Sequence, residues 1–362
     1  MHRSIRWFFS LTSVVAIGLG ASGCVPGTLN PTGTSDNDRF TFTYVEGDED
    51  SKNYLLEIRI NGPILNSPSS SSFFSLESGV IYAYQLQDLL EKAAEDDRIQ
   101  GLFLRLSTPG GTVVGSNVLY NALTAYKEVT QNPVYAYIEG LSASGGVWTM
   151  VAADEIYAAP GSIIGSIGVI GPTLVYFDEP FAVDGGLLGG GVTTRNGIQQ
   201  FVISAGKGKD LGNPFRQPSE EELQVWQRTI NTEYDKFVQH ISSTRDISEQ
   251  TLRQEMGAYI FGTEQAERYS LIDGTMGRPE AIAALVEALD WDEDDYQLVR
   301  IKREEPSLFD LLFGKQHPKL SYEEQQATIQ ADLCSLATHS ILAYHGDVLT
   351  LCPDHYSHGQ LH

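Results

Sequence analysis

The chain has 362 residues, of which 41% are hydrophobic and 20% are charged, as in a folded globular protein rather than a disordered one. This length is enough for one large hydrophobic core or two smaller ones. The formal net charge of -23 argues against a partner bound through its phosphate backbone, because such binding needs a basic face. We therefore expect no nucleic-acid partner.

Residues 1–24 have the pattern of a targeting segment. Arg3 and Arg6 precede an apolar run of about 15 residues, which is short for a membrane span. The run ends in ASGC, which resembles a bacterial lipoprotein signal with Cys24 as the lipidated residue, although Ala21 stands where leucine is usual. A cleaved secretory peptide and an uncleaved anchor are the alternatives. All three predict a body outside the cytoplasm, and we expect it to be membrane-anchored in a bacterial cell envelope and to face the periplasm.

Residues 25–52 are poor in periodic apolar side chains and predict a flexible tether. A folded domain is expected over 53–290, and residues 291–362 form a tail of unknown role. The domain opens with a predicted strand over 54–60. A serine-rich loop follows over 66–79, where Phe73 and Phe74 either touch substrate or lipid, or pack into the core.

Strands and helices then alternate along the chain. The spacing of apolar residues predicts a helix over 84–96, a strand over 100–106 and a helix over 116–129. A strand over 133–138 and a helix over 145–153 follow. Such an alternation indicates βα units arranged around a mainly parallel sheet, which is an α/β fold.

Two strand-to-helix junctions carry residues suited to catalysis. At the first, a proline turn leads into Gly110 and Gly111, whose backbone N–H groups no side chain shields. At the second, Ser144 and Gly145 stand where a helix begins, close to unpaired N–H groups. Together the junctions would place a nucleophile beside an oxyanion hole. The alternative is a helix-capping serine and a tight turn without catalytic function.

A serine nucleophile needs a base, and histidine is a poor candidate in this chain. Only His240 lies between the tether and the tail, on an apparently amphipathic helix where a surface or packing role is expected. The remaining candidates are Lys207 and Lys209. A free lysine has a pKa of about 10.4, so it acts as a base only where a closed apolar pocket lowers that value to roughly 7 to 8.

Five ordered blocks resemble the signal peptide peptidase A family of serine peptidases, over about residues 54–289. The blocks are STPGG at 107–111, ASGG at 143–146, GSIGVI at 165–170, GKDLGNPF at 208–215, and GAYIFGTEQA at 257–266 with LID at 271–273. The resemblance implies a Clp-protease and crotonase type of α/β spiral with a single catalytic domain. Family members with one copy of the domain form rings, so the resemblance implies a homo-oligomer.

The resemblance also assigns roles by position. Ser144 matches the family nucleophile and Lys209 its general base, whereas Lys207 does not match. Gly111 and the N–H of Gly145 occupy the place of the oxyanion hole, with Gly110 shaping the turn. In the rings of this family, serine and lysine come from neighbouring subunits, so an isolated chain is expected to be inactive. Neither a metal nor an organic cofactor is implied.

The sequence departs from the family between Ile170 and Lys209. Eight glycines lie between residues 185 and 208, where the family usually has a short helix and strand. This predicts a remodelled, mobile substrate wall. In addition, Val147 and Trp148 stand where the family commonly has tyrosines. These changes affect pocket shape more than chemistry.

The tail contains Cys334 and Cys352, the only cysteines besides Cys24. Outside the cytoplasm they could form a disulfide, which is the first alternative together with two free thiols. The second alternative is a metal site that uses these cysteines with His339, His345, His355 or His358, although their order matches no known zinc pattern. We favour the disulfide or free thiols.

The sequence therefore predicts a membrane-associated serine endopeptidase with a Ser-Lys dyad that cleaves hydrophobic peptides such as remnant signal peptides. Two other classes stay open. One is a catalytically inactive scaffold or regulator with the same fold, which labelling of Ser144 by a fluorophosphonate would exclude. The other is a crotonase-type acyl-thioester enzyme, which would release thiol from coenzyme A esters.

Overall fold

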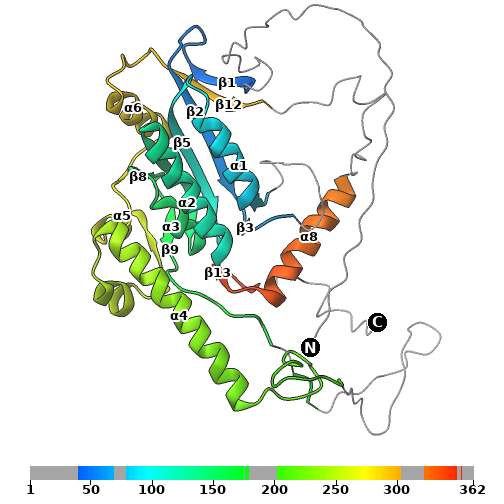
Figure 1. Ribbon diagram of the computed structural model, residues 1–362. Coiled ribbons are helices and arrows are strands. Elements are labelled where there is room, and N and C mark those ends of the chain that lie inside the picture. The colour runs from blue at the N-terminus through cyan, green and yellow to red at the C-terminus, as the bar shows by residue number, and fades with distance from the viewer. Residues whose placement is uncertain are drawn as a thin grey trace, which may run out of the picture. The chain divides into compact units, whose positions relative to one another are not determined.

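The computed structural model describes residues 40–68, 79–174, 176–178, 202–302, 322–348 and 352 (Figure 1). The targeting segment with Cys24, the loop residues Phe73 and Phe74, and most of the glycine-rich stretch 185–208 lie outside the described residues. Among the described helices, none has both the length and the apolar character needed to cross a membrane.

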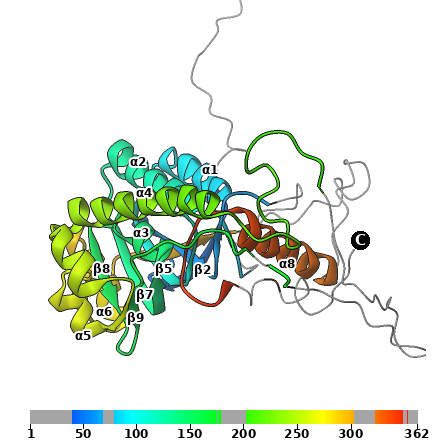
Figure 2. The same ribbon diagram turned by 90° about the horizontal axis from the view of Figure 1, so that it is seen from below.

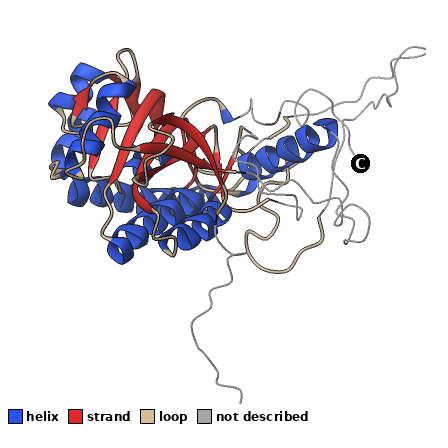
Figure 3. Cartoon of the chain, turned by 90° about the horizontal axis from the view of Figure 1, so that it is seen from above, coloured by secondary structure: helices blue, strands red, loops and turns tan. Residues whose placement is uncertain are grey.

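A largely parallel sheet forms the centre of the described chain. Its main strands, in spatial order, are β1 (Phe42–Gly47), β12 (Gln297–Ile301), β2 (Tyr54–Asn61), β5 (Ile99–Thr108), β7 (Val134–Ala143), β8 (Glu155–Ala158) and β11 (Gly274–Thr275). All neighbours in this order pair in parallel except the edge strand β1, which pairs antiparallel with β12. Figure 3 shows these strands between layers of helices.

Helices cover both faces of the sheet because its strands alternate buried side chains between the two faces (Figure 2). Leu56 and Ile58 belong to the apolar cluster that includes α1, α2, α3 and the carboxyl-terminal half of α4. Leu55 and Phe103 belong to the cluster that includes α6 on the opposite face. The helices are α1 (Ala83–Ala94), α2 (Val113–Thr130), α3 (Gly145–Met150), α4 (Glu220–Arg245), α5 (Thr263–Arg268), α6 (Arg278–Ala288) and α8 (Tyr322–His339), with a π-helical turn η3 at Thr251–Met256.

A second, smaller sheet lies beside the carboxyl ends of these strands. It contains β3 (Ile64–Leu65), β4 (Ile81–Tyr82), β6 (Gly110–Thr112) and β13 (Leu342–Tyr344), in the order β13-β6-β3-β4. A further strand, β9 (Ile163–Gly165), pairs with the last residues of β7 and with β10 (Ile260–Gly262). The chain therefore surrounds the end of β7 with short strands from several parts of the sequence.

Glu57 on β2 joins the α6 face of the sheet through ion pairs with four arginines. Its carboxylate accepts from Arg300 Nε at 2.6 Å, Arg59 Nε at 2.9 Å, Arg278 Nη2 at 3.1 Å and Arg105 Nη1 at 3.2 Å. Burial alone would raise the pKa of this carboxyl, but hydrogen bonds from Arg300 and Arg59 and the charge of Arg105 lower it to about 2. The cluster links β2, β5, β12 and α6.

The predicted elements from residue 54 to residue 150 are confirmed, but the expected domain limits differ from the structure. Residues 42–47, expected in the tether, form β1, and residues 297–301, expected in the tail, form β12. These two segments pair with each other across about 250 residues of chain, so neither carries a local signal that marks it as part of the sheet. The mixed α/β architecture agrees with the fold class that the resemblance implied.

Candidate active site

Ser144 stands at the end of β7, where the chain turns sharply into α3. Its backbone has φ 54 and ψ -113, a left-handed region that serine rarely adopts. The side chain is fully buried. Pairing continues through the turn, because the N–H of Ser144 donates to the carbonyl of Gly165 at 2.8 Å. The strained turn is therefore fixed by the neighbouring strand β9.

The Ser144 hydroxyl donates to the carbonyl of Gly168 at 3.2 Å and makes no capping hydrogen bond to α3. This excludes the alternative in which the serine merely caps the helix. The stretch from Gly165 to Gly168 instead wraps around the serine and supplies both backbone carbonyls that it contacts. A side chain held away from its own helix is available for chemistry.

The two glycine junctions meet beside Ser144. The nitrogen of Gly145 lies 2.5 Å from the position that a Cβ on Gly110 would take, and the nitrogen of Gly111 lies 3.1 Å from the corresponding position on Gly145. The N–H of Gly110 is already used, because it donates to the Thr108 hydroxyl at 3.0 Å. The N–H groups of Gly111 and Gly145 are thus the pair suited to an oxyanion, while Gly110 shapes the turn at φ 89.

Close packing explains why these positions are glycine. A Cβ on Gly111 would overlap the backbone of Ile64, and a Cβ on Gly145 would overlap the hydroxyl of Ser116. Ser116, on α2, is itself buried and donates to the carbonyl of Thr112 at 2.9 Å. The backbone N–H groups can approach one another because no side chain stands between them.

Lys209 lies in a different part of the molecule, in the loop that precedes α4. It is exposed, and within the described residues no hydrogen bond or ion pair joins its side chain to Ser144. The neighbouring Gly208 lies near the Glu222 side chain in the first turn of α4: a Cβ built on Gly208 would lie 3.6 Å from Oε1 of Glu222. The loop therefore belongs to the amino-terminal end of that helix.

The opposite end of α4 packs near the serine. Trp148 of α3 contacts Phe237 of α4 with ring centroids 4.8 Å apart. An α-helix rises 1.5 Å per residue, so residues 222 and 237 are separated by about 22 Å along its axis. Figure 1 shows α4 extending away from α3 towards this loop. The chain brings Ser144, Gly110, Gly111 and Gly145 together, and leaves Lys209 apart.

Comparison with known proteins shows which family the residues of this site belong to. The model of "Peptidase family S49" matches residues 127–291, a range that includes Ser144, Gly145 and Lys209. "Putative protease slr0021" of Synechocystis sp. is 31% identical over 220 residues, which cover 58% of this chain and 73% of that protein. The chain belongs to peptidase family S49. This confirms the resemblance that the ordered motifs indicated.

Two further relatives of this S49 chain are matched over a smaller share of their length. "Putative protease MJ0651" of Methanocaldococcus jannaschii is 32% identical over 198 residues, 55% of this chain and 59% of that protein. "Putative signal peptide peptidase SppA" of Enterococcus faecium is 28% identical over 232 residues, 64% of this chain and 62% of that protein. The chain thus spans less than two thirds of either relative.

His240 has a packing role in this S49 chain, as its sequence context suggested. Its ring stacks on Trp148 at 4.7 Å and meets the edge of Tyr120 at 4.3 Å. Burial lowers the pKa of the imidazole, against the effect of a 3.1 Å hydrogen bond between Nε2 and the carbonyl of Trp148. The ring nitrogen that faces α3 is engaged with the backbone, so His240 is no base for Ser144.

Ser166 is a site residue to which the sequence analysis gave no role. It adopts φ 58, is buried, and lies in the stretch that wraps around Ser144. Its N–H donates to the carbonyl of Tyr259 at 2.7 Å, and its hydroxyl lies 3.2 Å from Nδ1 of His345. The available signal was its place in the motif GSIG, one of the five blocks that carry the family resemblance.

The tail cysteines are joined: Cys334 and Cys352 form a disulfide with Cα atoms 4.6 Å apart. This confirms the disulfide among the alternatives and excludes the metal site that would have used both thiolates. Among the described residues, no group of three or more His, Cys, Asp or Glu side chains could hold a metal ion.

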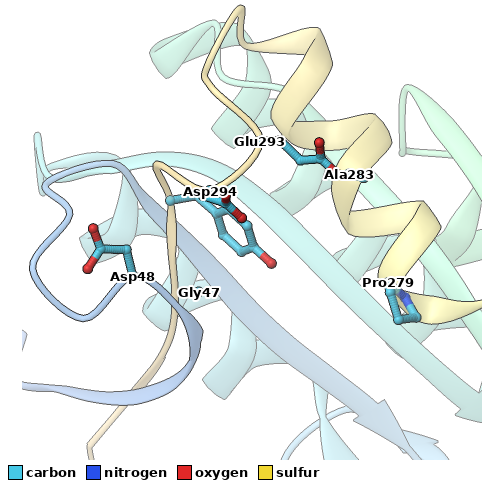
Figure 4. Close-up of a pocket in the computed structure, with 7 residues that line it drawn as sticks. Gly47, Asp48, Pro279, Ala283, Glu293 and Asp294 are labelled. Atoms are coloured by element: carbon cyan, nitrogen blue, oxygen red, sulfur yellow. The ribbon is translucent and has the colours of Figure 1, made fainter.

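A surface pocket lies at the opposite edge of the sheet from β8 and β11, between the β1 turn and α6 (Figure 4). Its lining includes the acidic side chains of Asp48, Glu293 and Asp294. The pocket contains none of the predicted site residues. We therefore place the candidate active site at Ser144 and not in this pocket.

Proposed function

We propose that this S49 protein is a serine endopeptidase that uses Ser144 and Lys209 to cleave hydrophobic peptides, such as remnant signal peptides, at a membrane. The observation that carries the proposal is the strained turn at Ser144, which holds a buried hydroxyl next to the N–H groups of Gly111 and Gly145. Family membership supports peptidase activity, and the match of Lys209 to the family motif supports its role.

The chemistry follows from these groups. The neutral amine of Lys209 takes the proton of the Ser144 hydroxyl as the oxygen attacks the peptide carbonyl, and the N–H groups of Gly111 and Gly145 bind the oxyanion. The lysine then gives the proton to the leaving amine, and water repeats the cycle on the acyl-enzyme. Burial against apolar side chains would keep the lysine neutral at working pH, since desolvation disfavours its charged form.

We propose that Lys209 reaches Ser144 of a neighbouring copy in a homo-oligomeric ring. Two observations support this. Lys209 lies too far from Ser144 in its own chain, and the region around it exposes large apolar side chains. Ile203 is fully exposed at 101%, and Val202, Leu223 and Val225 are each 48% exposed. Apolar groups of this kind are typical of a surface that a partner covers. A ring would bury the lysine as the chemistry requires.

Anchoring at a membrane surface rests on the targeting segment, with Cys24 as the residue to be lipidated. Metabolic labelling with palmitate is expected to mark the wild type and to leave Cys24→Ala unlabelled. Cys334→Ala serves as the matched control, because it removes another cysteine outside the targeting segment. Equal label in Cys24→Ala and the wild type would contradict lipidation at Cys24.

The test of the catalytic proposal is cleavage of a fluorogenic hydrophobic peptide by the full chain. Ser144→Ala and Lys209→Ala are expected to fall to background, while Lys207→Ala keeps activity because Lys207 is a solvated residue paired with Glu221 at 2.5 Å. A fluorophosphonate is expected to label the wild type and not Ser144→Ala. Full activity in either catalytic variant would remove the role assigned to that residue.

A further inference from the structure

The tail returns to the candidate active site through β13. This strand pairs antiparallel with β6, and the register sets Leu342 opposite Thr112, Ala343 opposite Gly111 and Tyr344 opposite Gly110. Hydrogen bonds flank the pairing: the N–H of His345 donates to the carbonyl of Pro109 at 2.7 Å, and the N–H of Val113 donates to the carbonyl of Ile341 at 3.3 Å. Residues 341–345 thus lie in extended form along the glycines beside Ser144.

The other edge of β13 is also paired. The N–H of Ile170 donates to the carbonyl of Leu342 at 2.8 Å, and the N–H of Leu342 donates to the carbonyl of Ile170 at 2.9 Å. The tail strand therefore lies between β6 and the chain that follows Gly168, and its backbone pairs with both. A peptide added to two strand edges is a general mode of peptide recognition.

The carbonyl of Ala343 lies beside the N–H groups of Gly111 and Gly145. A Cβ built on Gly110 would lie 2.2 Å from the Ala343 oxygen and 2.5 Å from the Gly145 nitrogen, and a Cβ built on Gly145 would lie 3.0 Å from the Ala343 oxygen and 3.1 Å from the Gly111 nitrogen. Hydrogen-bonded and non-hydrogen-bonded residue pairs alternate along an antiparallel ladder. Because His345 bonds to Pro109 and Val113 bonds to Ile341, the pair midway between them is also a hydrogen-bonded one. Ala343 and Gly111 are then a hydrogen-bonded pair, with the Ala343 carbonyl facing the N–H of Gly111.

Three interactions hold the tail in this place. Cys334 on α8 is joined to Cys352, so that β13 lies within a closed loop with a sequence separation of 18 residues. The hydroxyl of Tyr82 on β4 donates to Oδ2 of Asp332 on α8 at 2.7 Å. Leu342 and Val348 are buried and pack with Leu333 and Tyr344. A strand fixed at both ends loses little further entropy when it binds.

We propose that the groove between β6 and Ile170 is the peptide-binding site, and that the disulfide-closed segment Ile341–His345 fills it in the place of a substrate and inhibits its own chain. This inference rests on the proposed peptidase function. The bound segment presents the Ala343 carbonyl where the peptide bond of a substrate would be attacked. Ala343 is fully buried, so a large charged side chain at this position cannot enter the groove with the strand.

The test uses the full chain with Ala343→Arg, which expels the strand without touching a catalytic residue or a cysteine. We expect cleavage of a hydrophobic peptide to rise by about 5–150-fold, the usual range for coupling between two binding events. The double variant Cys334→Ser and Cys352→Ser, which opens the loop, should raise activity in the same direction. Ala327→Arg is the matched control, because Ala327 lies exposed on α8.

Hydrogen exchange separates this inference from the peptidase function. In Ala343→Arg the amides of Gly111, Val113 and Ile170 should exchange faster, whether or not the chain cleaves peptides. Faster exchange with unchanged or lower activity, in a chain whose wild type is active, would overturn the inhibitory role. If the same amides exchange as slowly in Ala343→Arg and in the cysteine double variant as in the wild type, β13 does not protect them, and the docking itself is overturned. Inactive chains throughout, with faster exchange in Ala343→Arg, would remove the peptidase function and support the docked strand.

Discussion

The serine side of the site and the lysine loop are built in opposite ways. Ser144 and its glycines are buried and held by backbone hydrogen bonds from β6, β7 and β9. Lys209 is exposed in a loop whose contacts are local, chiefly ion pairs from Arg216 to Asp210 at 2.8 Å and to Glu222 at 2.7 Å. One chain therefore preorganises the proposed nucleophile and oxyanion hole, whereas the proposed base, Lys209, lies exposed on the surface.

The largest expected effect tests whether the two sides come from different chains. Ser144→Ala and Lys209→Ala alone should each lose about 10⁴-fold or more in kcat. When the two variants are unfolded together and reassembled, roughly a quarter of the sites in a head-to-tail ring would pair an intact serine with an intact lysine. Peptide cleavage should return accordingly.

The control for this mixing experiment is the assembly state, measured by light scattering on the same samples. Each variant reassembled alone should form the same oligomer and stay inactive. A mixed oligomer without recovered cleavage would show that the dyad is not shared between chains.

The Glu57 cluster links four elements of the sheet side that carries α6, and Glu57→Gln should lower the free energy of unfolding by about 3 kcal/mol, because it removes the buried carboxylate that four arginines share. Urea unfolding measures this. Glu139→Gln is the control: Glu139 is 31% exposed and, among the described residues, forms an ion pair with Arg105 alone, so its loss should cost less.

The same carboxylate predicts a pH dependence. The pKa of Glu57 in the folded chain is about 2, below its usual 4.5. The stability that it contributes is therefore complete above about pH 4.5 and is lost as the pH falls towards 2. Glu57→Gln should remove this part of the acid sensitivity, and an unchanged acid profile would contradict the assignment.

A substitution at Gly111 tests the proposed role of this glycine in binding the oxyanion. Gly111→Ala should lower kcat by about 10²–10³-fold, because its Cβ displaces β6 from Ile64 and moves the N–H away from the reacting carbonyl. Gly262→Ala is the control, since a Cβ there meets nothing within 4 Å. Steady-state kinetics on folded protein would contradict the role if only KM changed.

The smallest expected effect concerns the lysine loop. Arg216→Ala removes the ion pairs that join Asp210 to Glu222 and should reduce peptide cleavage several-fold, because the segment next to Lys209 is less well placed. The thermal unfolding midpoint should change little, since ion pairs at a protein surface contribute little stability. Arg268→Ala, which removes an exposed pair with Glu264 on α5, is the control and should leave activity unchanged. Unchanged cleavage in Arg216→Ala would show that the loop needs no such support.

Much of the site was predictable from local patterns. Apolar spacing predicted the strands over 54–60, 100–106 and 133–138, and parallel strands bring their carboxyl ends to one edge of a sheet. Gly111 and Ser144 each follow such a strand, so their proximity could be expected before the fold was known. The direction of the Ser144 hydroxyl could not, because Gly168, which it contacts, lies 24 residues away.

The sequence by itself determined the α/β class, the serine with its glycines, and the lysine motif, because hydrophobic period, turn chemistry and short motifs are all encoded within a few neighbouring residues. Only the tertiary structure decided that residues 42–47 and 297–301 share the sheet, that Cys334 joins Cys352, and that residues 342–344 pair with Gly110–Thr112. These are pairings between distant segments, whose partners are set by burial and backbone geometry and leave no periodic signal in either segment alone.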